Sequence, residues 1–268
     1  MDILHLILLA LIQGLTEFLP VSSSAHLILP AQLLGWQDQG PLIDVMAHFG
    51  SLFAVLIYFR REVGEVLIGL KDLLRARLNK GSVLALNLIL ATPPAMIVGA
   101  GLHFSGIDEL IRSPLLIACT FIFFGIVLWL ADLKGARARG MSTLSWREAI
   151  GLGLAQTLAL IPGTSRSGIT MTAALAMGLT RAEAARFSML MSIPIIGAGG
   201  SFALIKLASS GAGGTASLSD GLIVASLSFV SAYAAIALFM KWVPHIGMFP
   251  FMVYRVVAGL GLLLWVLL

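Results

Sequence analysis

Long apolar runs dominate this chain, and six of them are long enough to cross a lipid bilayer as helices. An α-helix rises about 1.5 Å per residue, so about 20 apolar residues span the roughly 30 Å of hydrocarbon. The pattern therefore predicts six transmembrane helices, which lie at about 42–59, 83–103, 114–133, 184–207, 221–240 and 249–268.

Two further apolar regions, 3–35 and 149–179, are interrupted near their middle. The first is broken by Pro20 and the serines that follow it, and the second by Pro162-Gly163-Thr164-Ser165-Arg166-Ser167-Gly168. Each region can form one broken span, or two half-helices that enter and leave on the same side of the membrane. The apolar pattern alone does not choose between them.

The distribution of Lys and Arg does choose, because loops rich in these residues stay in the cytoplasm. Six lie in the 60–80 loop and four in 134–147, whereas the loop between the two intervening spans carries only Arg112. Arg181 and Arg186 follow the second interrupted region, and the later 208–219 loop has no Lys or Arg. The second interrupted region thus starts and ends inside, as a re-entrant hairpin does.

The two halves of the chain also resemble each other. Pro20-Val21-Ser22-Ser23 aligns with Pro162-Gly163-Thr164-Ser165 at an offset of 142 residues, and Leu128-Trp129-Leu130 echoes Leu264-Trp265-Val266. Each half, 1–135 or 136–268, would hold one re-entrant hairpin and three spans. Because three is odd, the second copy is inserted upside down, which predicts an inverted-topology repeat. The two hairpin tips would then meet near the bilayer midplane.

Composition supports one integral membrane domain over 1–268. Hydrophobic residues make up 59% of the chain, charged residues 11%, and the mean hydropathy is +0.99. These values exclude a water-soluble core, and we expect no separate soluble domain and no nucleic-acid partner. The amino-terminal residues lack the features of a removable signal peptide. Cys119, the single cysteine, is expected to be a small buried hydrophobe, without an internal disulfide or a cysteine-based metal site.

Gln13 and Glu17 are four residues apart, so they share one face of a helix and could share a ligand. A lone carboxylate within the membrane should be protonated or paired, because a bare charge there costs a few kcal/mol at least. The natural partners for Glu17 are Arg166, His26 and a divalent cation, Mg²⁺ or Ca²⁺, held through oxygens.

The 162–168 segment combines flexible backbone N–H groups, hydroxyls and a guanidinium, a composition that suits a phosphate. A helix-breaking turn capped by Ser and Thr is the alternative. That alternative explains the glycines and the hydroxyls, but it does not explain an arginine within the membrane, so we favour the phosphate site.

Several polar residues have two interpretations each. One of Ser22, Ser23 and Ser24 can cap the half-helix after Pro20, and another can be a nucleophile with His26 as its base, since His26 follows within one turn. A structural, hydrogen-bonded role for His26 is the alternative. The Asp44–His48 pair either positions the residues that contact the substrate or forms a purely structural hydrogen bond. For Arg255, helix packing and phosphate binding are equally good interpretations.

Residues 13–26, Gln-Gly-Leu-Thr-Glu-Phe-Leu-Pro-Val-Ser-Ser-Ser-Ala-His, together with 162–168 resemble the bacterial undecaprenyl-diphosphate phosphatase family, of the bacitracin-resistance type. The likeness extends to Pro-Phe-x-x-Tyr-Arg at 250–255, and so over essentially the whole chain. It implies that Glu17, Ser23, His26 and Arg166 are the principal catalytic residues. Gln13 stands where a relative has a second carboxylate, so any metal site is one charge poorer.

The resemblance implies hydrolysis of a C55 polyprenyl diphosphate in a bacterial inner membrane, which returns the monophosphate carrier to cell-wall synthesis. In our hypothesis, the hairpins and a cation hold the diphosphate, and either Ser23 attacks with His26 as base, or His26 activates a water. By the charge count the site opens to the periplasmic or outer face. A polyprenyl-phosphate flippase is the alternative, and a homodimer is compatible with the pattern. The predicted substrate-binding residues are Gln13, Ser22, Ser24, Gly163, Thr164, Ser165, Ser167 and Arg255, and the predicted metal ligands are Glu17 and Gln13.

Overall fold

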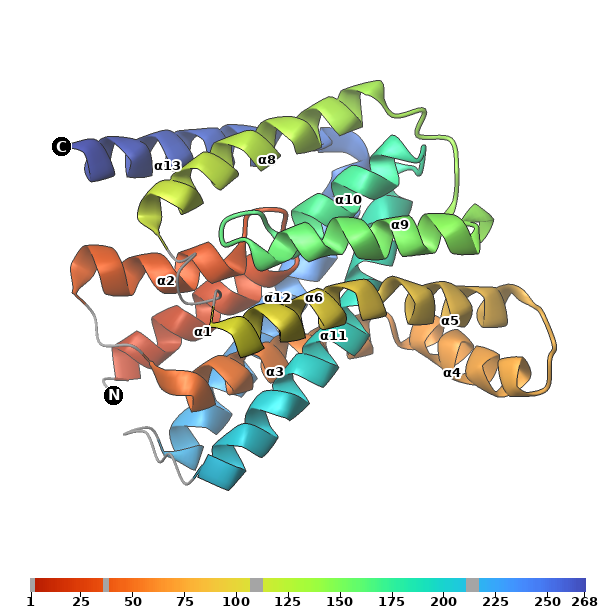
Figure 1. Cartoon of the computed structure of the whole chain (residues 1–268), viewed down its shortest axis with the longest axis horizontal. Helices are drawn as coiled ribbons and strands as arrows, with labels where there is room; N and C mark the ends of the chain where they lie inside the picture. The colour runs from red at the N-terminus through yellow and green to blue at the C-terminus, as the bar shows by residue number, and fades with distance from the viewer. Residues whose placement is uncertain (1–2, 36–38, 107–112, 211–216) are drawn as a thin grey trace.

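Helices account for nearly all of the chain in the computed structural model, which describes residues 3–35, 39–106, 113–210 and 217–268 (Figure 1). Arg112 and residues 211–216 of the 208–219 loop lie outside the described residues. The α-helices are α1 Ile3–Glu17, α2 Ser23–Leu34, α3 Gly40–Tyr58, α4 Arg60–Leu74, α5 Lys80–Ala91, α6 Pro93–Ser105, α8 Pro114–Lys134, α9 Trp146–Thr157, α10 Arg166–Ala176, α11 Arg181–Ser210, α12 Leu218–Ile246 and α13 Phe249–Leu267. Two short 3-10 helices, η1 Met141–Thr143 and η2 Leu158–Leu160, complete the order.

Six of the described helical segments are long and apolar enough to cross a membrane, which confirms the predicted spans and makes this a multi-pass membrane protein. Their bounds differ from the predicted ones by a few residues. The second span, Lys80–Ser105, is made of α5 and α6 in succession. The helix breaks at Thr92 because Pro93 and Pro94 lack the N–H groups that would continue its hydrogen-bond ladder.

The 60–80 segment, treated in the sequence as a loop, contains α4, and that expectation was wrong. Helix α4 packs against α5, and together they project from one end of the bundle (Figure 1). Asn79 caps α5 by accepting from the Ser82 N–H at 3.0 Å, and its side-chain amide donates to Asp72 at 2.6 Å. The capping box and the turn chemistry explain why the chain reverses here rather than continuing as one helix.

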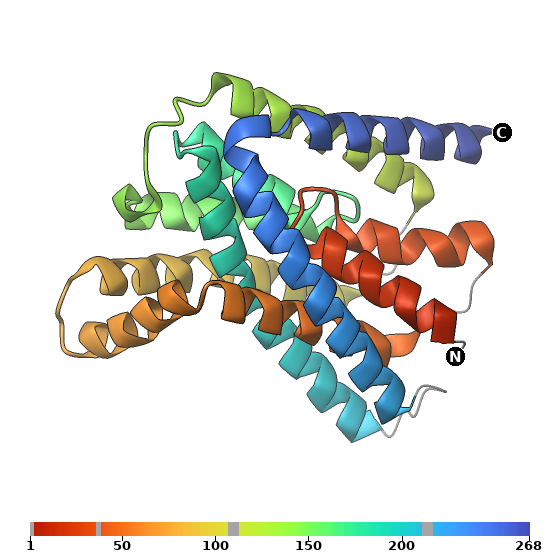
Figure 2. The ribbon, with the colours of Figure 1, turned by 180° about the vertical axis from the view of Figure 1, so that it is seen from behind.

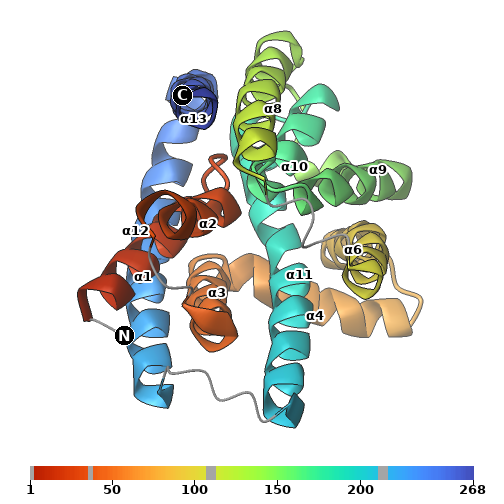
Figure 3. The same cartoon turned by 60° about the vertical axis from the view of Figure 1, so that its left-hand side comes forward.

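Helix α12 crosses α1 and α3 on one side of the molecule (Figure 2). Glycines make this close approach possible: a Cβ on Gly50 would lie 2.2 Å from the Ala225 carbonyl oxygen, and one on Gly14 would lie 2.6 Å from the Ser228 carbonyl oxygen. Small residues at crossings are the usual way in which membrane helices gain van der Waals contact. On another side α8 and α13 run together, and α3 lies against α11 (Figure 3).

The two interrupted regions each form a helix, a sharp turn and a second helix that turns back. Serines with a positive φ of 71°, Ser22 and Ser165, stand immediately before α2 and α10. They are 143 positions apart, and α1 and α9 begin at Ile3 and Trp146 with the same spacing. The backbone therefore corrects the sequence offset of 142 by one residue. The sequence alignment matched Pro20 with Pro162, whereas the backbone of the two turns matches Ser22 with Ser165.

Cys119 is exposed on α8, not buried as expected. Its neighbours Ile117 and Ala118 are fully buried against the hairpins and α13. A step of one residue rotates the side chain by about 100° around a helix, which turns Cys119 outward.

Candidate active site

The two turns meet in the middle of the bundle. The Ser167 hydroxyl, just after the second turn, donates to the Leu19 carbonyl of the first at 2.8 Å. Beside this contact is a cavity of about 410 Å³. It is lined by Glu17, Ser22, Ser23 and Ser24 of the first hairpin, Ala159, Ser165 and Arg166 of the second, Asp44, Val45 and His48 of α3, and Ile195, Ile196, Gly199, Gly200 and Ala203 of α11.

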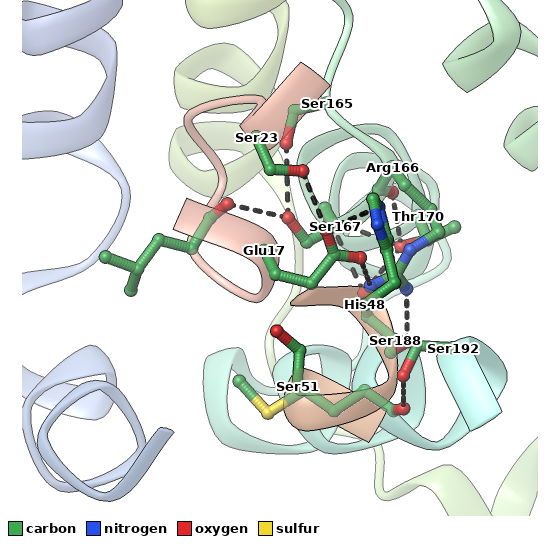
Figure 4. A network of polar contacts seen from close by, with 12 residues as sticks. Glu17, Ser23, His48, Ser51, Ser165, Arg166, Ser167, Thr170, Ser188 and Ser192 are labelled. Carbon is green, nitrogen blue, oxygen red and sulfur yellow. Dashed lines mark hydrogen bonds and ion pairs between the residues drawn. The ribbon is translucent and has the colours of Figure 1, made fainter. Parts of the chain in front are cut away.

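Glu17 lies at the centre of the polar network at this cavity (Figure 4). Its Oε2 accepts hydrogen bonds from Gln13 Nε2 at 3.0 Å and from the Ser23 hydroxyl at 2.7 Å. Its Oε1 accepts from Arg166 Nη2 at 3.3 Å, and His48 Nε2 lies 3.9 Å from Oε2. The carboxylate is thus paired, as its depth in the protein requires. Of the protein partners predicted for it, the structure supplies Arg166.

Arg166 reaches Glu17 from the opposite hairpin, as the first residue of α10. Its Nη1 donates to the Ser188 carbonyl oxygen at 3.2 Å. Its Nε is buried and has no hydrogen-bond partner among the described residues. A guanidinium presents five donors in a planar fork, so one that lines the cavity with a free N–H retains capacity for a phosphate oxygen.

The serines of the first turn differ in their surroundings. Ser22 occupies the N-cap position of α2, but its side chain makes no capping hydrogen bond and lies 3.2 Å from the Ser24 hydroxyl. The predicted cap is therefore not formed by Ser22. In the second turn Ser165 does cap its helix, accepting from the Gly168 N–H at 3.1 Å, and lies 3.1 Å from the Ser167 hydroxyl. Ser23 is the serine whose hydroxyl faces Glu17.

His26 is engaged away from the cavity. Its Nδ1 lies 2.7 Å from the Ser22 carbonyl oxygen and its Nε2 lies 2.5 Å from the Tyr254 hydroxyl, with the two rings stacked at 5.8 Å. The structure does not bring the imidazole to Ser23, and its role as a base remains a prediction. The histidine that lines the cavity is His48, held by its Nδ1 at 2.7 Å from the Asp44 carbonyl oxygen.

The place of His48 at the cavity was not predicted from the sequence. The signal was present, because a histidine four residues after an aspartate in an apolar span is as unusual as His26. The two were separated only by the motif that surrounds His26.

Arg255 is completely buried and lies behind the two turns, not in the cavity. Its guanidinium donates to the carbonyl oxygens of Pro20, Thr120, Phe121, Gly163 and Thr164 at distances from 2.9 to 3.4 Å. Every N–H direction is used, so of the two roles left open the structure favours packing. Arg255 joins the two turns and satisfies carbonyls that would otherwise be buried without a donor.

Gly163 and Thr164 are also part of this support and do not line the cavity. Gly163 has a φ of 88°, and a Cβ there would lie 2.1 Å from the Thr120 hydroxyl. The position therefore needs glycine for both conformation and space. Their carbonyls face Arg255, which leaves Ser165 and Arg166 as the lining residues of this turn.

Oxygen ligands for a cation are few in this part of the molecule. Gln13 is completely buried, and its Oε1 has no hydrogen-bond partner among the described residues. Glu17 is beside it, but its charge is already balanced by Arg166. Within the described residues no group of three or more His, Cys, Asp and Glu could hold a metal ion. Together, Glu17 and Gln13 can supply at most part of the six or more oxygens that Mg²⁺ or Ca²⁺ takes.

A polytopic helical protein that joins a hydroxyl, a carboxylate and an arginine at one cavity has the features of a membrane protein that acts on an anionic group. Residues 6–261 match the family model described as bacitracin resistance protein BacA. The chain belongs to that family.

Curated proteins named undecaprenyl-diphosphatase are similar over the full length. The protein from Maricaulis maris is 53% identical over 266 residues, which cover 99% of both chains. The protein from Chromohalobacter salexigens is 49% identical over 273 residues, which cover 99% of this chain and 100% of the relative. The protein from Ruegeria pomeroyi is 49% identical over 264 residues, which cover 98% of both chains.

Proposed function

We propose that this protein is an undecaprenyl-diphosphatase, which hydrolyses undecaprenyl diphosphate to undecaprenyl phosphate and inorganic phosphate. The observation that carries the proposal is the arrangement of Ser23, Glu17 and Arg166, in which the serine hydroxyl and the guanidinium both contact the same carboxylate. Recycling of the lipid carrier in this way underlies cell-wall synthesis and bacitracin resistance in the family.

In the proposed mechanism Arg166 binds the terminal phosphoryl group and neutralises its charge. Phosphoryl transfer needs mainly positioning and charge neutralisation. The Ser23 hydroxyl oxygen attacks the terminal phosphorus and passes its proton to Glu17 Oε2, the acceptor at 2.7 Å. A Ser23–phosphorus bond forms, the bridging P–O bond breaks, and undecaprenyl phosphate leaves. Water then attacks the phosphoserine, releases inorganic phosphate and restores the serine.

Two other routes remain in the proposal as alternatives to this proton path. His26 can replace Glu17 as the base if its ring leaves the Tyr254 hydroxyl, or it can activate a water that attacks the phosphorus directly.

The apolar part of the cavity, with Ile195, Ile196 and Ala203 of α11, suits the first isoprene units of the lipid tail. Ser22, Ser24 and Ser165 line the cavity and would donate to phosphate oxygens.

A divalent cation, Mg²⁺ or Ca²⁺, fits only if the diphosphate provides most of its oxygens. Glu17 and the free Oε1 of Gln13 are the protein oxygens that we propose as its ligands. When bound, the cation would neutralise charge on the phosphates. The protein's own residues would still position Ser23 and hold the phosphoryl group.

The proposed topology has two re-entrant hairpins in an inverted repeat, with 1–135 and 136–268 as the halves of one membrane domain. The shared φ of 71° at Ser22 and Ser165 and the common offset of 143 support it. The site would open to the outer face of the inner membrane and release phosphate there. A homodimer stays a prediction, to be checked by the particle mass in detergent.

The test is phosphate release from undecaprenyl diphosphate by purified protein, with and without EDTA. Arg166→Ala should lower the rate by about 100-fold or more, equivalent to about 3 kcal/mol of barrier. Arg147→Ala is the matched control, since Arg147 lies outside the cavity, beside Trp146. If folded wild type binds the lipid and releases no phosphate under any metal condition, the flippase alternative replaces the enzyme.

A further inference from the structure

A second cavity, of about 430 Å³, lies at the other end of the α3–α11 pair. It is bounded by the junction of α3 and α4, the first turns of α11 and the last turns of α12. Four of its lining residues are cationic, namely Arg60, Arg61, Arg186 and Lys241, and Glu62 is the acidic one. Positive charge therefore exceeds negative charge around this cavity.

The excess charge is not cancelled by neighbouring side chains. Arg186 pairs with Glu62 at 3.7 Å and with Glu183 at 3.4 Å, so its charge is balanced. Arg60, Arg61 and Lys241 make no side-chain hydrogen bond or ion pair with the described residues. These three side chains are exposed to solvent and have no anionic partner of their own, because Glu62 in the same cavity pairs with Arg186. They repel one another, and a bound anion would relieve that repulsion.

The buried donor in this cavity is an independent sign of an anion site. The Nε of Arg186 is buried and has no hydrogen-bond partner among the described residues, although the carboxylate of Glu62 lies 3.7 Å away. The ion pair with Glu62 balances the charge of Arg186, but at 3.7 Å it leaves this N–H without a hydrogen bond. An oxygen of a ligand in the cavity would supply the acceptor.

The cavity also has the right depth for a lipid head group. It adjoins the last residues of the α3 span, where the ring of Tyr58 packs edge-on against that of Tyr233 at 5.7 Å. Tyrosines are enriched at the membrane–water interface. The Lys- and Arg-rich loops lie at this end, which predicts that it faces the cytoplasmic leaflet, where anionic lipids are concentrated.

This cavity is separate from the one at Glu17. Along α3, Tyr58 follows His48 by ten residues, which is about 15 Å of helix. Between them the buried side chains of Leu52, Val55 and Phe187 belong to the main hydrophobic core. We propose that the second cavity binds the phosphate group of an anionic membrane lipid from the cytoplasmic leaflet.

The experiment measures binding of phosphatidic acid to the full-length protein in detergent by native mass spectrometry, with phosphatidylcholine as the neutral lipid. Arg61→Gln combined with Lys241→Gln should weaken phosphatidic acid binding by about tenfold or more, because two unpaired cations are lost. The matched control is Arg75→Gln combined with Arg77→Gln, two exposed cations at the same end of the protein that do not line the cavity.

Phosphate release from undecaprenyl diphosphate should be unchanged in both double variants, which shows that each is folded. Lys241→Gln alone is the substitute if the cavity double variant does not fold. Equal weakening in the control would mean a diffuse basic surface, and equal binding of phosphatidylcholine would mean that the cavity does not select for negative charge. Either result would overturn the proposal. Inorganic phosphate separates the two sources of the anion. If it binds as tightly as phosphatidic acid, the cavity takes the free ion and the lipid assignment is wrong.

Discussion

The first and second turns share a backbone but carry opposite chemistry. Both place a serine with a φ of 71° before a helix, and in both that serine lies close to the hydroxyl of the serine two residues later, at 3.2 Å in one and 3.1 Å in the other. The residue immediately after the positive-φ serine is Ser23 in the first turn and Arg166 in the second. Ser23, the proposed nucleophile, and Arg166, the proposed phosphate-binding residue, therefore occupy equivalent positions.

The difference extends to the helices that precede the turns. Gln13 corresponds to Gln156, and both amides are buried, but Glu17 corresponds to Leu160. At this position the first hairpin has a carboxylate, and the second has an apolar residue. The two turns thus have similar geometry, and one hairpin places a glutamate and the other an arginine at the same cavity.

The largest effect that tests the difference between the two hairpins is expected when the carboxylate of Glu17 is removed. Glu17→Gln should lower kcat/KM for undecaprenyl diphosphate by about 1,000-fold, or about 4 kcal/mol of barrier, because the acceptor of the Ser23 proton is lost while the shape is kept. Leu160→Met, at the equivalent position of the second hairpin, should change it by less than about twofold. Steady-state phosphate release measures both.

His26→Ala tests whether His26, and not Glu17, accepts the proton of Ser23. Both ring nitrogens of His26 are engaged with the Ser22 carbonyl and the Tyr254 hydroxyl, so its removal should cost less activity than Glu17→Gln. A larger loss for His26→Ala would reassign the proton acceptor to the histidine.

Much of the fold was predictable because the bilayer imposes long apolar runs and a charge asymmetry between its two sides. Interrupting residues such as Pro20 and Gly163 marked the turns in advance. Helix α4 was missed because its apolar positions follow a helical period in a segment otherwise rich in charge. In a chain of such long spans, a short amphipathic helix has a weaker signal than the loop composition around it.

The site was predictable in its residue types but not in its contacts. The pairing of Glu17 with Arg166 followed from the cost of an unpaired charge in the membrane. Which histidine lines the cavity did not, because His48 lies on α3, outside both turns, and only the packing of α3 brings it to Glu17. Arg255 could not be assigned either, since the five carbonyls that it contacts come from three separate segments.

Arg255, which is buried, and Arg166, which is partly exposed, allow a structural role to be compared with a role in the site. Arg255→Met should lower the free energy of unfolding by about 3 kcal/mol, because it leaves carbonyls of both turns without donors. Arg166→Met should cost less stability and more activity, since its guanidinium also faces the cavity. Thermal unfolding in detergent, measured beside phosphate release, compares them. The same ratio of stability to activity loss in both variants would contradict separate roles.

The smallest predicted effect concerns the start of the second hairpin, where the Arg139 guanidinium, followed by the Ser145 backbone N–H, lowers the pKa of Glu148 from its usual value near 4.5 to about 2. Because the folded-state pKa is the lower one, this contribution to stability is complete above about pH 4.5 and is lost as the pH falls toward 2. Partial exposure limits it to about 1 kcal/mol.

Glu148→Gln should therefore lower the melting temperature at pH 7 by a few degrees, and the gap between the variant and the wild type should narrow as the pH falls from 5 to 3. Thermal unfolding in detergent across that range measures the gap. His5 occupies the equivalent position in the first hairpin. The melting temperatures of His5→Gln and the wild type should show no difference of this acid-dependent kind. A constant gap for Glu148→Gln at every pH would show that packing, and not the ion pair with Arg139, accounts for the stability of this turn.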